Sequence, residues 1–440
     1  MLFCREKSTQ ITVKQQISDF CFVFTVLKMS YIIVPSSEIV NFTDMKNMLK
    51  LSLFFLLLMQ SCSQEAWLSG TINGENDGDW KPMVYLVQPK KFDEVAQSFV
   101  GEVLDSAQMT QNGRFEFTTP PESKKSILLE LVVQKKGEKY PNRLLNENPK
   151  TDNYFPLVYE PGSNLVIEAE IAHFQSSLKI NQPSASNKAM LQLRDLRSKA
   201  HKRYLEGQNE EHGPDEDLLE REKSQYNFKE ELINFSDSTK ELLPAMVALR
   251  WTSPEGDYER IAELVHAQST KWSKLYPEHP WVKELVAMAD KQNLPILIGD
   301  LIPELQFPMK RGEVVSIQKI LKNKALVLLD VWASWCAPCR VENRKILVPL
   351  WEEYNSQNFQ IVAYGLESSE KAWDNAIEKD GAYRWLHASH LQGDQNPLME
   401  ILRLKTIPAN FLLNQEGRVL AKNLHGQDLI DFVQDYMGKQ

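Results

Sequence analysis

An apolar run that leads straight into two cysteines constrains the fold of this chain more than any other feature. Residues 325–333 read ALVLLDVWA, and Asp330 is the one charged residue among them. A short continuous apolar run is typical of a strand that is buried on both faces of a sheet. Cys336 and Cys339 follow directly. We expect a helix to begin just after Cys336 and to run to about Tyr354.

The rest of the C-terminal third alternates between expected strands and helices. They are a strand at 359–365, a helix at 370–379, a hairpin of strands at 411–413 and 418–421, and a final helix at 428–437. Strand–helix–strand followed by a hairpin and a helix is the order of the thioredoxin fold. We therefore predict an α/β thioredoxin-like domain over residues 294–440.

The spacing of Cys336 and Cys339 suits disulfide exchange, in which a thiolate attacks and a second thiol resolves the mixed disulfide. The unpaired N–H groups and the dipole at a helix start stabilise a thiolate and lower its pKa. We expect the sulfur of Cys336 to be exposed and Cys339 to lie one turn inside the helix. The alternatives are an inert pair or a metal site. Zinc needs four ligands, and His387 and His390 have no second cysteine pair to join. We expect no metal and no cofactor beyond the redox-active disulfide.

The segment 332–339, WASWCAPC, closely resembles the active-site segment of the thioredoxin family. More specifically, residues 294–440 resemble the membrane-tethered ResA/TlpA-type reductases of bacterial envelopes. The resemblance implies that Cys336 is the nucleophile and Cys339 the resolving cysteine. Trp335 is expected to flank the site as an apolar wall.

The same resemblance implies roles for the carboxylates of Asp330 and Glu342. Asp330 matches a buried carboxylate that assists proton transfer at the resolving cysteine, and desolvation would raise its pKa towards that of a working base. The alternative is a strand-end aspartate in water. Glu342 matches a glutamate near the dithiol of ResA-type reductases, with a solvated surface glutamate as the alternative.

Ile407 and Pro408 precede the expected strand at 411–413. In the thioredoxin fold the matching proline is cis and lies against the dithiol, and the preceding residue offers backbone hydrogen bonds to an extended substrate. The resemblance therefore makes Ile407 and Pro408 expected substrate contacts. An ordinary trans proline at a strand entrance is the alternative.

Residues 45–61 have the layout of a secretory signal, with a positive start at Lys46 and Lys50 and a short apolar run. Cys62, directly after it, resembles the lipidated cysteine of bacterial lipoproteins. A short membrane anchor or a buried apolar helix is the alternative. Since such signals work from the N-terminus, we expect residues 1–44 to be an untranslated extension or disordered.

Two further regions lie between the signal and the C-terminal domain. Short runs of alternating apolar and polar residues over 62–175 predict an antiparallel β-sandwich, and Asn112-Gly113 indicates a hairpin turn. Residues 185–293 predict a helical connector. The stretch 103–117 resembles a module of unknown function that precedes such thioredoxin domains in Gram-negative lipoproteins, which implies architecture and not activity.

The net charge of −9 and the pI near 5.6 argue against a nucleic-acid partner, which would require a basic face. We expect a periplasm-facing lipoprotein of the cell envelope that reduces protein disulfides and is re-reduced by a membrane electron donor. No histidine stands between the cysteines, which predicts a reducing potential. The alternatives are a thiol peroxidase and a binding or scaffold lipoprotein in which the dithiol is secondary.

Overall fold

The computed structural model describes residues 65–74, 79–96, 101–141, 148–206 and 214–439. The expected signal at 45–61, the lipidation site Cys62 and residues 1–44 lie outside the described residues. The chain from Ala66 to Gln440 forms one unit in terms of internal contacts. No helix among the described residues combines the length and the apolar character needed to cross a membrane.

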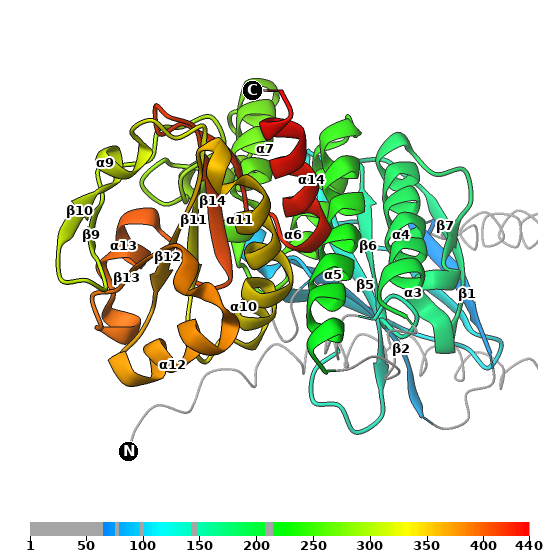
Figure 1. Cartoon of the computed structure of the whole chain (residues 1–440). Coiled ribbons are helices and arrows are strands. Elements are labelled where there is room, and N and C mark those ends of the chain that lie inside the picture. Colours follow the sequence, from blue (N-terminus) through cyan, green and yellow to red (C-terminus); the bar gives the residue numbers. More distant parts are fainter. Residues whose placement is uncertain (1–64, 75–78, 97–100, 142–147, 207–213, 440) are drawn as a thin grey trace, which may run out of the picture. The chain divides into compact units, whose positions relative to one another are not determined.

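Two four-stranded sheets occupy the region predicted to be β-rich (Figure 1). The first has the order β4 (Arg114–Phe117), β1 (Leu68–Asn73), β7 (Leu165–Glu170) and β8 (Lys179–Ile180). The second has the order β3 (Glu102–Gln108), β2 (Trp80–Gln88), β5 (Ile127–Lys135) and β6 (Tyr154–Tyr159). Strands β1 and β7 run parallel, whereas the other neighbours are antiparallel. The expectation of a purely antiparallel arrangement is therefore wrong at one pair.

The turn at Asn112-Gly113 forms, but it does not close a hairpin. Gly113 has a φ of +71°, and its N–H donates to the carbonyl of Thr110 at 2.9 Å. A Cβ at Gly113 would lie 2.0 Å from the carbonyl oxygen of Ile72, so only glycine fits there. The strands on either side, β3 and β4, belong to different sheets. A strong local turn signal cannot distinguish a hairpin from a crossing between sheets.

A short helix, α3 (Phe174–Ser177), precedes β8. In the described part of the region predicted to be a helical connector, five helices follow. They are α4 (Ala185–Tyr204), α5 (Pro214–Ser238), α6 (Leu242–Thr252), α7 (Ala262–Leu275) and α8 (Pro280–Met288). Every residue of α6 is buried. The buried residues of these helices and of the two sheets form one continuous hydrophobic cluster, from Trp67 to Leu297. The helices therefore share a core with the sheets.

A second hydrophobic cluster extends from Ile296 to Met437 and surrounds a five-stranded mixed sheet. Its order is β13 (Leu386–Ala388), β12 (Phe359–Gly365), β11 (Leu326–Trp332), β14 (Ala409–Leu413) and β15 (Val419–Lys422). Strands β11, β12 and β13 are parallel, and β14 and β15 are antiparallel to their neighbours. A separate hairpin, β9 (Gln306–Pro308) and β10 (Val314–Ser316), precedes it.

The helices of this part agree with the expected order. They are α9 (Ile317–Leu321), α10 (Ala337–Glu342), α11 (Val348–Tyr354), α12 (Glu370–Asp380), α13 (Pro397–Leu402) and α14 (Gly426–Met437). A π-helical turn joins α10 to α11, so one bent helix runs from the end of β11 to Tyr354, where Figure 1 shows its two halves in succession. This arrangement places the cysteines where the central strand β11 gives way to α10.

Candidate active site

Cys336 and Cys339 are joined by a disulfide at the start of α10. Their Cα atoms lie 5.4 Å apart. Cys336 is the N-cap residue, and its sulfur accepts a hydrogen bond from the backbone N–H of Cys339 at 3.3 Å. A thiolate at this position would receive the same N–H group and the positive end of the helix dipole. The site therefore has the local electrostatics that disulfide exchange requires.

The exposure of Cys336 differs from the expectation. The residue is 6% exposed and Cys339 is 3% exposed, so the expectation of an exposed Cys336 is not met in this disulfide form. Its sulfur is bonded to that of Cys339, one turn into the helix.

Asp330 lies within β11, where it pairs with Ala363 of β12 and with Asn410 of β14. Its side chain is buried, which excludes the alternative of an aspartate in water. Desolvation and, to a smaller extent, the negative charge of Glu342 raise its pKa to about 8, while His425 acts in the opposite direction. A carboxyl group with this pKa exchanges protons readily with a thiol, whose ordinary pKa is about 8.5.

Glu342 is buried too, at 3% exposure, so the alternative of a solvated surface glutamate is wrong. Its Oε2 lies 2.9 Å from Nδ1 of His425, and its Oε1 accepts a hydrogen bond from the N–H of Gly426 at 3.2 Å. The carboxylate thus joins the end of α10 to the start of α14. The sequence interpretation missed His425, because no local pattern links two residues that are 83 positions apart.

The loop that carries His425 is fixed by the strand that faces Asp330. The side-chain amide of Asn410 donates to the carbonyl of Leu424 at 2.6 Å, and its oxygen accepts from the N–H of the same residue at 3.1 Å. Since Asn410 pairs with Asp330 across β11 and β14, one register sets both the buried acid and the position of His425. Asp330, Glu342 and His425 therefore form an electrostatically coupled group.

Two further carboxylates secure the segment around the cysteines. Glu367 accepts hydrogen bonds from the backbone N–H of Ser334 and from its hydroxyl, the latter at 2.9 Å. Asp380 has a side chain with no exposure, and it binds the guanidinium groups of Arg340 at 2.7 Å and of Arg344 at 2.9 Å. The guanidinium of Arg340 also donates to the carbonyl of Ser334 at 3.1 Å. These contacts hold the residues before and after the disulfide at fixed positions.

The residues expected to touch substrate lie at the surface or near it. Trp335 is 65% exposed and directly precedes Cys336, whereas Trp332 is buried in the core. The peptide bond between Ile407 and Pro408 is cis, and both residues are half-buried.

The C-terminal part of the chain is similar in sequence to known oxidoreductases. The Redoxin family model matches residues 297–432. Thiol-disulfide oxidoreductase ResA of Oceanobacillus iheyensis is 26% identical over 145 residues, which are 32% of this chain and 71% of that protein. ResA of Bacillus subtilis is 27% identical over 117 residues, 27% of this chain and 62% of that protein. A solved thioredoxin domain of a thiol-disulfide oxidoreductase from Bacteroides vulgatus is 27% identical; the match covers 32% of this chain and 99% of that one, with a TM-score of 0.30.

The matches fall on the part of the chain that carries the disulfide at a helix start and the mixed five-stranded sheet. The expected α/β thioredoxin-like architecture of the C-terminal part is confirmed. The Redoxin match and the similarity to the ResA proteins support a thioredoxin-like oxidoreductase of the ResA/TlpA type for this C-terminal domain.

Proposed function

We propose that Cys336 and Cys339 exchange dithiol and disulfide with protein partners in the cell envelope, mainly as a reductase. The observation that carries the proposal is the joint placement of a bonded cysteine pair at a helix start and a buried Asp330 whose pKa is raised to about 8. Neither feature alone would be enough for disulfide exchange, because exchange needs an attacking sulfur and also a base that accepts the proton of the second thiol.

In the reduced protein, the thiolate of Cys336 attacks one sulfur of a substrate disulfide. A mixed disulfide forms, and the other substrate sulfur leaves as a thiolate. In molecules in which Asp330 is ionised, Cys339 then gives its proton to that carboxylate and attacks the sulfur of Cys336. The intramolecular disulfide forms, the second substrate sulfur leaves, and the substrate has gained two electrons.

Glu342 and His425 tune this proton transfer without touching the sulfurs in the proposal. The negative charge of Glu342 raises the pKa of Asp330, whereas His425 lowers it. The side chain of His425 is 22% exposed, so it links the buried acids to water. Glu342 and His425 are therefore positioning residues, and Asp330 is the base.

Trp335, Ile407 and Pro408 are the proposed substrate contacts. The exposed indole offers an apolar wall beside Cys336, and the backbone of Ile407 is the proposed pairing partner of an extended substrate segment. Re-reduction of the disulfide requires two electrons from outside the chain, and we assign this step to a membrane dithiol donor. No further cofactor is needed for the cycle.

The site is proposed to face the periplasm, with Cys62 lipidated and residues 45–61 removed as a signal. The two N-terminal sheets are proposed to form a sandwich that, with its helices, holds the oxidoreductase domain away from the membrane. The acidic composition, with a net charge of −9, suits protein substrates better than nucleic acid.

Trapping tests the proposal directly. The variant Cys339→Ser retains the attacking sulfur and lacks the resolving one, so substrates should remain covalently attached to Cys336 and be released by dithiothreitol. The matched variant Cys336→Ser should trap much less, because its remaining sulfur lies deeper in the helix. Equal adducts on both variants, or none on either, would overturn the proposal.

A further inference from the structure

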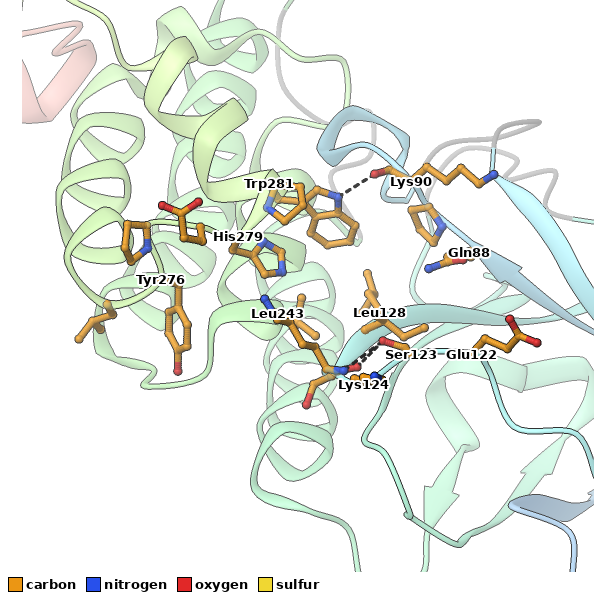
Figure 2. Close-up of a pocket in the computed structure, with 18 residues that line it drawn as sticks. Gln88, Lys90, Glu122, Ser123, Lys124, Leu128, Leu243, Tyr276, His279 and Trp281 are labelled. Carbon is orange, nitrogen blue, oxygen red and sulfur yellow. Dashed lines mark hydrogen bonds between the residues drawn. The ribbon is translucent and has the colours of Figure 1, made fainter.

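A pocket of about 940 Å³ lies in the N-terminal module, apart from the cysteines. One wall comes from the segments after β2 and before β5, and the opposite wall from the turn between α7 and α8 (Figure 2). Its volume falls within the range of small-ligand sites, about 300–1,000 Å³. The proposed redox function leaves this pocket without a role.

The inner surface of the pocket is apolar. Leu128, Leu243 and Trp281 line it and are buried members of the first hydrophobic cluster. Tyr276 lines the same pocket with 45% of its surface exposed. Leu128 comes from strand β5, whereas Leu243 comes from helix α6, and Tyr276 and Trp281 come from the end of α7 and the start of α8 (Figure 2). A ligand with an aromatic or branched apolar body would find contact on both walls.

The pocket also carries positive charge that the protein does not neutralise by ion pairing. Lys124 and Lys125 line it and are exposed. Among the described residues, neither ammonium group lies within ion-pair distance of a carboxylate. The charge of Lys125 also acts on groups of the pocket: burial is the main cause of the lowered pKa of His279 and Lys283 that of Glu278, and Lys125 adds to the lowering in both. Two free ammonium groups beside an apolar surface favour an anion.

The other charged groups of the pocket do not cancel this preference. Lys90 is paired with Glu102, and Glu278 with Lys283 at 2.7 Å. Burial lowers the pKa of His279 below its ordinary value, so the imidazole is neutral at neutral pH. Glu122 is the remaining carboxylate, and Figure 2 shows it at the end of the pocket away from His279.

We propose that this pocket binds a carboxylate carried on an apolar body. The apolar part would lie between Leu128 and Trp281, and the carboxylate would lie against Lys124 and Lys125. The same chemistry occurs in a free aryl or aliphatic acid and in a peptide segment where an acidic residue adjoins a large apolar one.

The test uses the purified full chain with 3-phenylpropionate as the probe and 3-phenylpropylamine as its charge-reversed match. Ligand-observed NMR should give saturable binding of the acid and none of the amine. The double variant Lys124→Glu/Lys125→Glu should weaken binding of the acid about 10-fold, since each exposed ion pair contributes a modest amount. Tyr276→Ala should weaken it too.

A matched control carries the same charge change elsewhere on the module. Lys179→Glu/Lys188→Glu reverses two exposed lysines outside the pocket, and it should leave binding unchanged. Competition by acetyl-Leu-Asp-Leu-amide would assign the site to a peptide segment, and saturable binding of the acid without such competition would assign it to a free acid. Equal binding of acid and amine, or equal loss in both double variants, would overturn the proposal.

Discussion

Nδ1 of His425 lies 2.9 Å from Oε2 of Glu342, and this contact joins a partly exposed ring to a buried carboxylate at the end of α10. The two residues act on Asp330 with opposite sign. Glu342 raises the pKa of Asp330 and His425 lowers it. The acid–base behaviour of the site therefore depends on a pair that lies outside the CxxC motif.

Because Glu342 and His425 act on the pKa of Asp330 in opposite directions, two variants should shift the pH profile of mixed-disulfide resolution in opposite directions. Glu342→Gln removes a negative charge, so the pKa of Asp330 should fall below about 8 and the pH profile of mixed-disulfide resolution should move to lower pH. His425→Asn removes the opposing influence, so the profile should move to higher pH. Stopped-flow measurement of resolution from pH 5 to pH 10 checks both. His173→Asn, at an exposed site in the N-terminal module, should shift nothing.

The raised pKa of Asp330 also predicts how stability depends on pH. The folded protein holds this proton up to about pH 8, whereas the unfolded chain loses it near the ordinary value of 3.8. The stabilising contribution is therefore complete below the unfolded pKa and is lost as pH rises through 8. Asp330→Asn should flatten this dependence. Urea unfolding of both proteins at pH 5 and pH 8 measures it, and parallel pH dependence in the two would contradict the assignment.

Asp330→Asn should also slow the resolution of the mixed disulfide. Loss of a positioned base typically costs about 100-fold or more in rate. The first attack, by Cys336, should change far less, because its thiolate is stabilised by the helix start. Separate rates for mixed-disulfide formation and resolution, measured by quenched alkylation, test this; a similar loss in both steps would argue for a structural role.

The contacts of Asp380 predict a large effect on stability. Its buried carboxylate binds Arg340 and Arg344, so Asp380→Ala should lower the free energy of unfolding by about 3 kcal/mol, the loss expected when one partner of a buried ion pair is removed. Glu352→Ala is the matched control, since Glu352 pairs with Arg384 at the surface. That variant should change stability by less than about 1 kcal/mol. Chemical denaturation curves measure both.

Trp335 should affect substrate binding and not stability. Its indole is 65% exposed, and Trp335→Ala should therefore change the free energy of unfolding by less than about 0.5 kcal/mol. The KM for a protein disulfide should rise while kcat stays close to the original value. An unchanged KM would remove Trp335 from the substrate contacts.

The sequence predicted the C-terminal domain well because its signals are local. The apolar run at 325–333 became the central strand β11, and the proline-containing turn after Cys336 became the start of α10. The match at residues 332–339 suggested the chemistry. The run of apolar residues and the motif at 332–339 were enough to predict the central strand, the start of the helix and the chemistry of the cysteines.

The parts that the sequence did not predict depend on distant contacts. His425 meets Glu342 across 83 positions and Glu367 meets Ser334 across 33, so no window of sequence contains either pair. The turn at Asn112-Gly113 formed as expected, yet its strands joined different sheets.

The redox equilibrium of Cys336 and Cys339 shows whether this pair acts as a reductant. The full chain would be equilibrated in glutathione and dithiothreitol buffers, and the dithiol fraction counted by alkylation and mass spectrometry. We expect a two-electron transition with a midpoint near that of thioredoxin, about −270 mV. A midpoint near that of DsbA, about −120 mV, would contradict the reducing role. A cysteine pair that does not interconvert at any ratio would contradict the disulfide-exchange mechanism itself.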